Sequence, residues 1–177
     1  RLSDSFDATK PLKVGRRMIH DDHPKKRILT IPEIYTFSSN IGSSLVIREV
    51  GTDIQQDYLQ RFGLFDRPSI ELTGLSGPIL PRHWGEIQSS DFSASADEQA
   101  DHRIISLDTS QKIRQLMRLA VDYGSGGNAH VDGYRVGGKT GTAEKVKNGH
   151  YSRQDKITSF VGVFPVDDPQ YVIFAML

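Results

Sequence analysis

The chain has 177 residues, and its 22 basic and 22 acidic side chains leave no net charge. This balance removes the global field that would attract a polyanion, so we expect no nucleic-acid partner. The absence of cysteine excludes disulfides, thiolate zinc sites and cysteine nucleophiles. Hydrophobic residues make up 37% of the sequence, an ordinary value for a globular domain. The length suits one domain, or most of one.

The N-terminal third is predicted to be helical only after an irregular start. Residues 1–30 are polar without a sustained period, and we expect loop and extended structure there. Thr30 followed closely by Pro32 has the form of a helix start, because threonine caps free N–H groups and proline is tolerated in the first turn. The helix should be interrupted at residues 38–40 and then resume until Gly51.

The middle of the chain gives a weaker signal. Asp53 is expected to cap a further short helix that ends at Gly63. Residues 64–90 mix prolines and glycines with short apolar runs, which favours loops and short strands.

A clear helix is predicted over about residues 109–123, because apolar side chains recur there at i, i+3, i+4 and i+7. The apolar positions are Ile113, Leu116, Met117 and Ala120, and the candidate caps are Asp108, Thr109 and Ser110. Gly124 and the glycines that follow should end this helix.

The remainder of the sequence is predicted to be extended. The expected strands cover residues 134–136 leading into 139–146, then 158–164 and 171–176. Asn148-Gly149 is a strong hairpin signal, and Asp167-Asp168-Pro169 marks the next turn. We therefore expect an α+β fold, with an antiparallel β-sheet flanked by helices.

One motif near the C-terminus has two interpretations. Residues 133–140 match the phosphate-binding pattern G-x-x-x-x-G-K-S/T. That loop functions only when a helix follows it, because the phosphates rest on the helix N-terminus. The residues after Lys139 include an early glycine, two β-branched threonines and a hairpin signal, so a helix is not expected and we set this interpretation aside.

The second interpretation reads Lys139, Thr140 and Gly141 as the K-T-G element of serine acyltransferases that bind penicillin. A lysine on a strand can bind a substrate carboxylate by charge and hydrogen bonding. Glycine beside it leaves room for an acyl donor along the strand edge. The N–H of the next residue, Thr142, can then point at a developing oxyanion.

Ser38-Ser39-Asn40 fits the S-x-N element of the same enzymes. Ser38 offers a hydroxyl for proton relay, and Asn40 offers an amide that can hold a catalytic lysine and a substrate amide. A purely structural alternative remains open, in which both residues only interrupt and cap helices.

Three stretches closely resemble the class B penicillin-binding proteins, especially the septal cell-division transpeptidase; they are residues 34–47, 58–63 and 133–145. The resemblance implies a penicillin-binding, β-lactamase-like transpeptidase fold and D,D-transpeptidase activity without a cofactor or metal. It implies peptidoglycan stem peptides, β-lactam antibiotics and cell-division membrane proteins as partners. It also implies a parent protein anchored by an N-terminal segment at the periplasmic face of the inner membrane.

The resemblance also implies roles for individual residues. Ser38 and Asn40 would be the relay and orienting pair, and Lys139 would act with them as the third catalytic residue. Thr140, Gly141 and Thr142 would bind the substrate, with the Thr142 N–H as one oxyanion donor.

The sequence departs from the family in two places. No serine has a lysine three positions later, so we expect the S-x-x-K element, which carries the nucleophile, to precede Arg1. Residues 1–177 are therefore expected to be the C-terminal part of a single transpeptidase domain. A segment that members of the family have is also absent near residues 90–91. We predict that Ser90 and Asp91 are not joined by a peptide bond, whose Cα–Cα spacing is about 3.8 Å.

Two other functions remain open at this point. The same acyl chemistry could end in water, as in a D,D-carboxypeptidase or a β-lactamase, or the chain could be a non-catalytic remnant that binds peptides or partner proteins. The histidines and aspartates of residues 20–23 lack the spacing of a metal site and are interpreted as a solvated loop.

Overall fold

The computed structural model describes residues 1–66, 103–147 and 150–177. The predicted break between Ser90 and Asp91 and most of the predicted 64–90 loop region lie outside these residues. Within the described ranges, no helix combines the length and apolar character that crossing a membrane requires.

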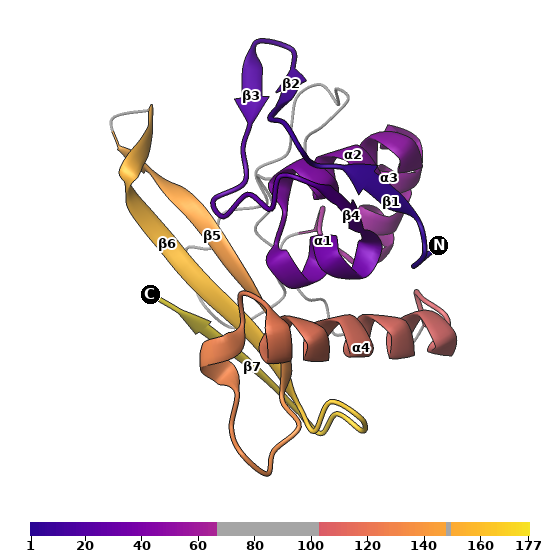
Figure 1. Ribbon diagram of the computed structural model, residues 1–177. Coiled ribbons are helices and arrows are strands. Elements are labelled where there is room, and N and C mark those ends of the chain that lie inside the picture. Colours follow the sequence, from indigo (N-terminus) through magenta and orange to yellow (C-terminus); the bar gives the residue numbers. More distant parts are fainter. Residues whose placement is uncertain (67–102, 148–149) are drawn as a thin grey trace.

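The N-terminal segment forms two small antiparallel pairs of strands. β1 (Ser5–Asp7) pairs with β4 (Ile28–Thr30), and β2 (Leu12–Val14) pairs with β3 (Arg17–Ile19). The β2–β3 hairpin projects from the body of the molecule (Figure 1). The sequence predicted only loop and extended structure here, because strands of three residues are too short to show a period.

Two helices follow, with the predicted interruption between them. α1 (Ile31–Phe37) begins after Thr30, and α2 (Asn40–Val50) ends before a glycine. The Glu33 carboxylate accepts hydrogen bonds from the Thr30 N–H, at 2.9 Å, and from its hydroxyl, at 3.1 Å. This confirms the predicted helix start and ties the first turn to the strand before it.

α3 (Thr52–Arg61) corrects one predicted cap. Gly51 occupies the N-cap position, and Asp53 lies inside the first turn. An aspartate there still favours the helix, because its charge faces the positive N-terminal end of the helix dipole. The helix ends before Gly63, which adopts a positive φ of 71°.

α4 (Leu107–Tyr123) begins two residues before the predicted start. The predicted caps are wrong, because Ser106 is the N-cap and its hydroxyl accepts a hydrogen bond from the Thr109 N–H at 3.1 Å. Leu116 and Ala120 are buried as the periodicity predicts, whereas Ile113 is 37% exposed. α4 packs against both α1 and the sheet (Figure 1).

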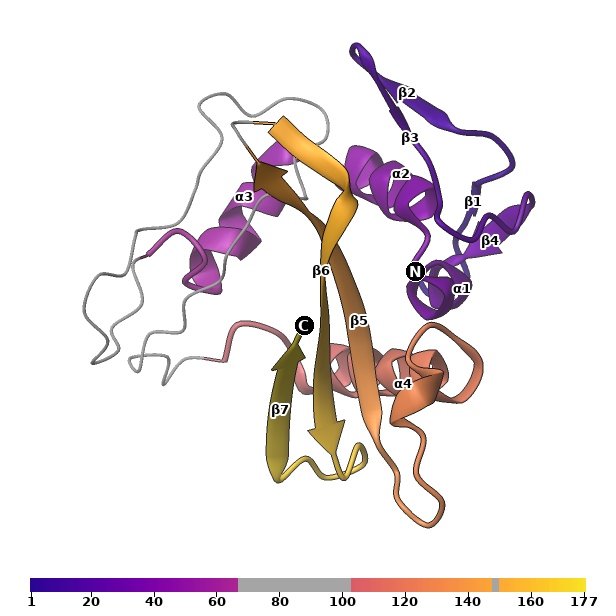
Figure 2. The same ribbon diagram turned by 90° about the vertical axis from the view of Figure 1, so that its left-hand side faces the viewer.

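The C-terminal sheet is the predicted antiparallel meander. Its strands lie in the order β5 (Gly137–Lys147), β6 (His150–Phe164) and β7 (Tyr171–Met176), so β5 is an edge strand (Figure 2). The predicted strand over residues 134–136 is wrong, because only Tyr134 forms an isolated bridge in that stretch. β6 also starts at residue 150 rather than 158, so the β5–β6 arm is longer than the sequence indicated.

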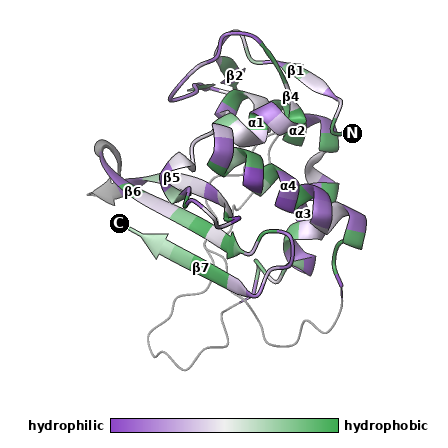
Figure 3. Cartoon of the chain, turned by 60° about the horizontal axis from the view of Figure 1, so that its bottom comes forward, coloured by the Kyte–Doolittle hydropathy of each residue, from purple (hydrophilic) through white to green (hydrophobic). Residues whose placement is uncertain are grey.

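The main buried cluster lies between the N-terminal strands and helices α1 and α2; it consists of Ala8, Leu29, Ile34 and Ile41. By contrast, every residue of β7 is exposed although the strand is apolar (Figure 3). The described molecule thus has a closed core on its N-terminal side and an uncovered strand at the far edge of its sheet.

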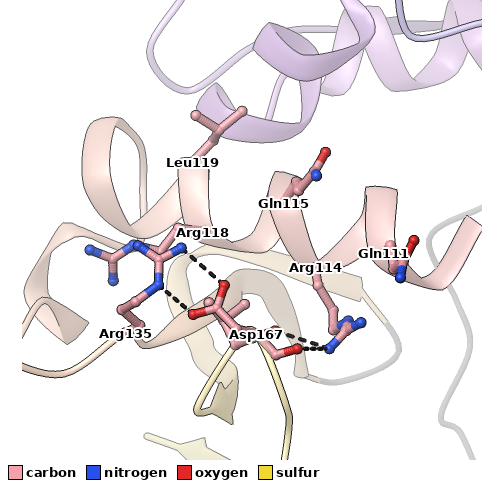
Figure 4. Close-up of a pocket in the computed structure, with 8 residues that line it drawn as sticks. Gln111, Arg114, Gln115, Arg118, Leu119, Arg135 and Asp167 are labelled. Carbon is pink, nitrogen blue, oxygen red and sulfur yellow. Dashed lines mark hydrogen bonds and ion pairs between the residues drawn. The ribbon is translucent and has the colours of Figure 1, made fainter. Parts of the chain in front are cut away.

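Arginines on and near α4 hold the turn that follows β6 (Figure 4). They border a cavity of about 690 Å³ lined by Gln111, Arg114, Gln115, Arg118, Leu119, Arg135, Val166 and Asp167. Arg114 donates to the carbonyls of Val166 and Asp167, and Arg135 forms a two-pronged ion pair with the Asp167 carboxylate. These contacts fix the β6–β7 turn against the helix.

Candidate active site

The turn between α1 and α2 presents Ser38 to the sheet. Ser38 adopts a left-handed conformation, with φ 54° and ψ 45°, and its N–H donates to the Tyr35 carbonyl at 3.2 Å. Such a conformation costs a residue other than glycine about 1 kcal/mol or more, so the surroundings must hold it. Ser39 supports the next helix, because its hydroxyl accepts a hydrogen bond from the Gly42 N–H at 2.9 Å.

Lys139 meets this turn from the edge strand β5. Its Nζ donates to the Ser38 Oγ at 2.7 Å and to the Thr140 carbonyl at 2.9 Å, and it lies 5.8 Å from the centre of the Tyr35 ring. Burial lowers the pKa of the Lys139 ammonium, because the charged form loses hydration. No carboxylate among the described residues forms an ion pair with it, so this cation is available to an incoming anion.

The remaining predicted residues line one groove beside this contact. The groove has a volume of about 410 Å³, and its walls include Ser38, Asn40, Thr140, Gly141 and Thr142. All six predicted site residues therefore lie at one place, although Ser38 and Lys139 are 101 positions apart in the sequence.

Two glycines allow the close packing around the groove. A Cβ on Gly141 would lie 2.7 Å from the Ser159 hydroxyl of the neighbouring strand. Glycine at this position therefore permits the close packing of β5 against β6. A Cβ on Gly124 would lie 2.0 Å from the Thr36 carbonyl oxygen. Glycine at position 124 thus lets the end of α4 approach the end of α1, next to Ser38.

Asn40 is held in place by the loop that precedes α1. Its side-chain amide donates to the His20 carbonyl at 3.0 Å. The amide is exposed and lines the groove, so it remains accessible to a substrate.

The sequence missed several groove residues. Ser125 shares a 2.7 Å hydrogen bond with the Thr140 hydroxyl, and Asp22 and His23 form part of the groove wall. The predicted solvated loop at residues 20–23 is therefore part of this site. Ser125 follows a glycine-rich helix end that carries no sequence signal for such a contact.

The structure also bears on two other interpretations of the sequence, a phosphate-binding loop and a metal site. Lys139 lies within a strand and is followed by more strand, which is the wrong context for a phosphate-binding loop. In the described part of the chain, no group of three or more histidine, aspartate or glutamate side chains could hold a metal ion.

Comparison with known proteins agrees with this geometry. The family model for the penicillin binding protein transpeptidase domain matches residues 92–177. The chain is 33% identical, over 203 aligned residues, to the probable peptidoglycan D,D-transpeptidase FtsI of Caulobacter vibrioides, covering 93% of this chain and 34% of that protein. It is 41% identical over 97 residues to stage V sporulation protein D of Bacillus subtilis, covering 55% of this chain and 15% of that protein.

A solved structure shares the fold. Penicillin binding protein 3 of Mycobacterium tuberculosis, complexed with ampicillin, matches with a TM-score of 0.83 at 24% identity, over 99% of this chain and 51% of that one. The chain thus spans about a third of the length of the Caulobacter relative and half of the solved chain. The solved structure shows the shared fold, and the family model with the Caulobacter relative shows that the chain belongs to the penicillin-binding proteins and is part of their transpeptidase domain.

Proposed function

We propose that the protein containing this chain is a peptidoglycan D,D-transpeptidase that cross-links stem peptides through a serine acyl-enzyme and is acylated by β-lactam antibiotics. The observation that carries the proposal is the 2.7 Å contact between the Lys139 Nζ and the Ser38 Oγ at a groove lined by the K-T-G residues. The names of the relatives, which include a probable peptidoglycan D,D-transpeptidase, support it.

Each residue has a role that its position supports. The Lys139 ammonium, with Thr140 and Thr142, binds the terminal carboxylate of the donor peptide. Ser38 accepts a hydrogen bond from Lys139, so its own proton is free to pass to the leaving amine. The Thr142 N–H contributes to the oxyanion hole, and Asn40 orients the substrate amide.

The nucleophile is expected in an S-x-x-K element, because that element accompanies the K-T-G element in penicillin-binding proteins. No serine of this sequence has a lysine three positions later. We place that element in another part of the longer protein, as the partial coverage of the relatives allows. The resemblance of residues 34–47, 58–63 and 133–145 to the septal transpeptidase supports a role in division, with cell-division membrane proteins as partners. We place the enzyme at the periplasmic face of the inner membrane, anchored by an N-terminal segment.

The proposal is tested with fluorescent penicillin and the full-length protein. The wild type should form a covalent adduct and should join two stem peptides. Lys139→Ala should slow adduct formation by about 100-fold or more, because it removes a charged contact made with the substrate carboxylate. Release of free donor peptide without cross-links would instead indicate a D,D-carboxypeptidase, and the absence of any adduct would indicate a non-catalytic remnant.

A further inference from the structure

We propose that the arginine-lined cavity beside α4 is a binding site for a phosphate group. The cavity has a volume of about 690 Å³ and shares no lining residue with the groove of the K-T-G residues. Its walls combine residues of α4, the segment before β5 and the β6–β7 turn, so three parts of the chain converge there (Figure 4). This site takes no part in the acyl transfer proposed above.

The lining carries an excess of positive charge. Arg114, Arg118 and Arg135 accompany a single carboxylate, Asp167, although the chain as a whole has no net charge. Arg135 forms an ion pair with Asp167, and Arg118 forms one at 2.6 Å with Asp122, which lies outside the lining. Within the described ranges Arg114 has no ion-pair partner and donates only to backbone carbonyls. One positive charge of the cavity is therefore left for an anion.

The three arginines act together on one carboxyl group. The Arg135 hydrogen bond is the largest cause that lowers the pKa of Asp167, and the charges of Arg135, Arg114 and Arg118 lower that pKa further. Figure 4 shows Asp167 between Arg135 and Arg114. An oxyanion of the chain itself is thus stabilised here, and the same field attracts an oxyanion from solution.

The cluster also has more hydrogen-bond donors than the described chain has acceptors for. The Nε–H groups of Arg114 and Arg118 are buried and have no partner among the described residues. Gln111 and Gln115, one helical turn apart, line the cavity with exposed side chains that form no described hydrogen bond. Charged donors without an acceptor are unfavourable, so a ligand with several acceptor oxygens is favoured.

The arrangement of the donors favours phosphate over a second carboxylate. A planar carboxylate is satisfied by one guanidinium fork, as Asp167 is by Arg135. The other donors belong to successive turns of α4, whereas Arg135 comes from the segment before β5. A phosphate group offers three acceptor oxygens in different directions and carries a charge of about −1.5 to −2 at pH 7. It can therefore accept from donors on more than one element.

The test is a calorimetric titration of the full-length protein with inorganic phosphate, in which sodium chloride keeps the ionic strength constant. Binding should saturate, and it should weaken as the ionic strength is raised. Gln115→Glu places a negative charge in the lining without removing a described hydrogen bond, and it should weaken phosphate binding roughly tenfold. Gln60→Glu, the same change at an exposed position of α3, should bind phosphate like the wild type.

A second pair of variants separates binding from a structural role of the arginines. Arg114→Gln should weaken phosphate binding by roughly 10- to 100-fold, because it removes a charged donor. Arg114→Lys, which keeps the charge but not the planar fork, should recover part of that loss. If Arg114→Gln lowers the melting temperature but leaves the phosphate dissociation constant within about twofold of the wild type, the arginine serves the fold alone and the inference is overturned.

Glycerol 1-phosphate distinguishes the source of the phosphate group. Tighter binding of this ester than of inorganic phosphate would support a site for a phosphate carried by a larger molecule, and the reverse order would support a site for the free ion. In both cases Gln115→Glu should weaken the binding. Titration heats no different from those of sodium chloride, or tighter binding of the dicarboxylate succinate than of either phosphate compound, would overturn the inference.

Discussion

At the scale of single residues, the site depends on a lysine that burial has made less basic. Lys139 keeps its hydrogen bonds to Ser38 and Thr140 while losing hydration, and the cost of that loss falls on its charged form. The Lys139 ammonium can therefore attract a carboxylate, and it loses its proton more readily than the ammonium of a free lysine.

This gives a prediction for the pH dependence of acylation. If the Lys139 ammonium binds the β-lactam carboxylate, acylation should fall as pH rises through the pKa of Lys139, which lies below that of a free lysine. Lys139→Arg retains its charge at all accessible pH values, so any remaining activity should lose this alkaline decline. Rate constants from pH 6 to 10 with a β-lactam that carries a carboxylate would check it. An identical alkaline limb in both proteins would contradict the assignment.

At the scale of elements, the contribution of the start of α1 to the free energy of unfolding should decrease at acid pH. The Arg27 side-chain hydrogen bond, followed by the Thr30 N–H, lowers the pKa of Glu33 to about 2. The pKa of an unfolded glutamate is about 4.3, so the stabilisation is complete above that value and is lost as pH falls toward 2. Glu33→Gln should therefore lower the free energy of unfolding at pH 7, and its difference from the wild type should shrink between pH 4.5 and 2.

Urea titrations at a series of pH values would measure this difference. Glu49→Gln, a change at an exposed position of α2, serves as the matched control and should show no such trend. A Glu33→Gln difference that stays constant down to pH 2 would show that the carboxylate charge contributes nothing to the cap.

The junction of α1 and α4 depends on a second local feature. Gly124→Ala would place a Cβ 2.0 Å from the Thr36 carbonyl oxygen, so the helix ends must separate. We expect a loss of about 1–3 kcal/mol in unfolding free energy, the range for overpacking, together with slower acylation because Ser38 lies beside this junction. Gly127→Ala is the control, since its Cβ would meet nothing nearer than 3.9 Å. Equal stabilities of the two variants in urea would refute this account.

At the scale of the whole molecule, the described chain leaves an apolar strand uncovered. Five large apolar or aromatic residues of β7 are more than 60% exposed, namely Tyr171, Val172, Ile173, Phe174 and Met176. An uncovered edge strand of this kind favours association of chains (Figure 3).

We therefore expect a protein made of these 177 residues alone to self-associate at micromolar concentration. Val172→Lys and Phe174→Lys together should reduce the association, because charges on an edge strand oppose pairing. Sedimentation velocity of both proteins would measure it. Lys13→Glu, in the distant β2–β3 hairpin, should leave the association unchanged. A monomeric wild-type fragment would contradict the expectation.

The sequence by itself determined most of the elements, and it indicated the chemistry that we propose. Helix ends marked by Thr30, Gly51 and Gly124, and the three-stranded meander, could be predicted because capping and turn residues act within a few positions. Ser38 and Lys139 could be proposed as site residues because the S-x-N and K-T-G patterns are local in the sequence, and their roles stay a prediction. The boundaries failed where local signals compete, as at the start of α4, where Ser106 rather than Asp108 is the cap.

Only the tertiary structure decided how the motifs meet. The Ser38–Lys139 contact joins residues 101 positions apart, and it depends on the close approach of α4 to α1 at Gly124. The contact of Ser125 with Thr140 was hidden for the same reason, because 15 positions separate the two residues. Spacing along the chain carries no record of such pairs, whose geometry is set by the packing of whole elements.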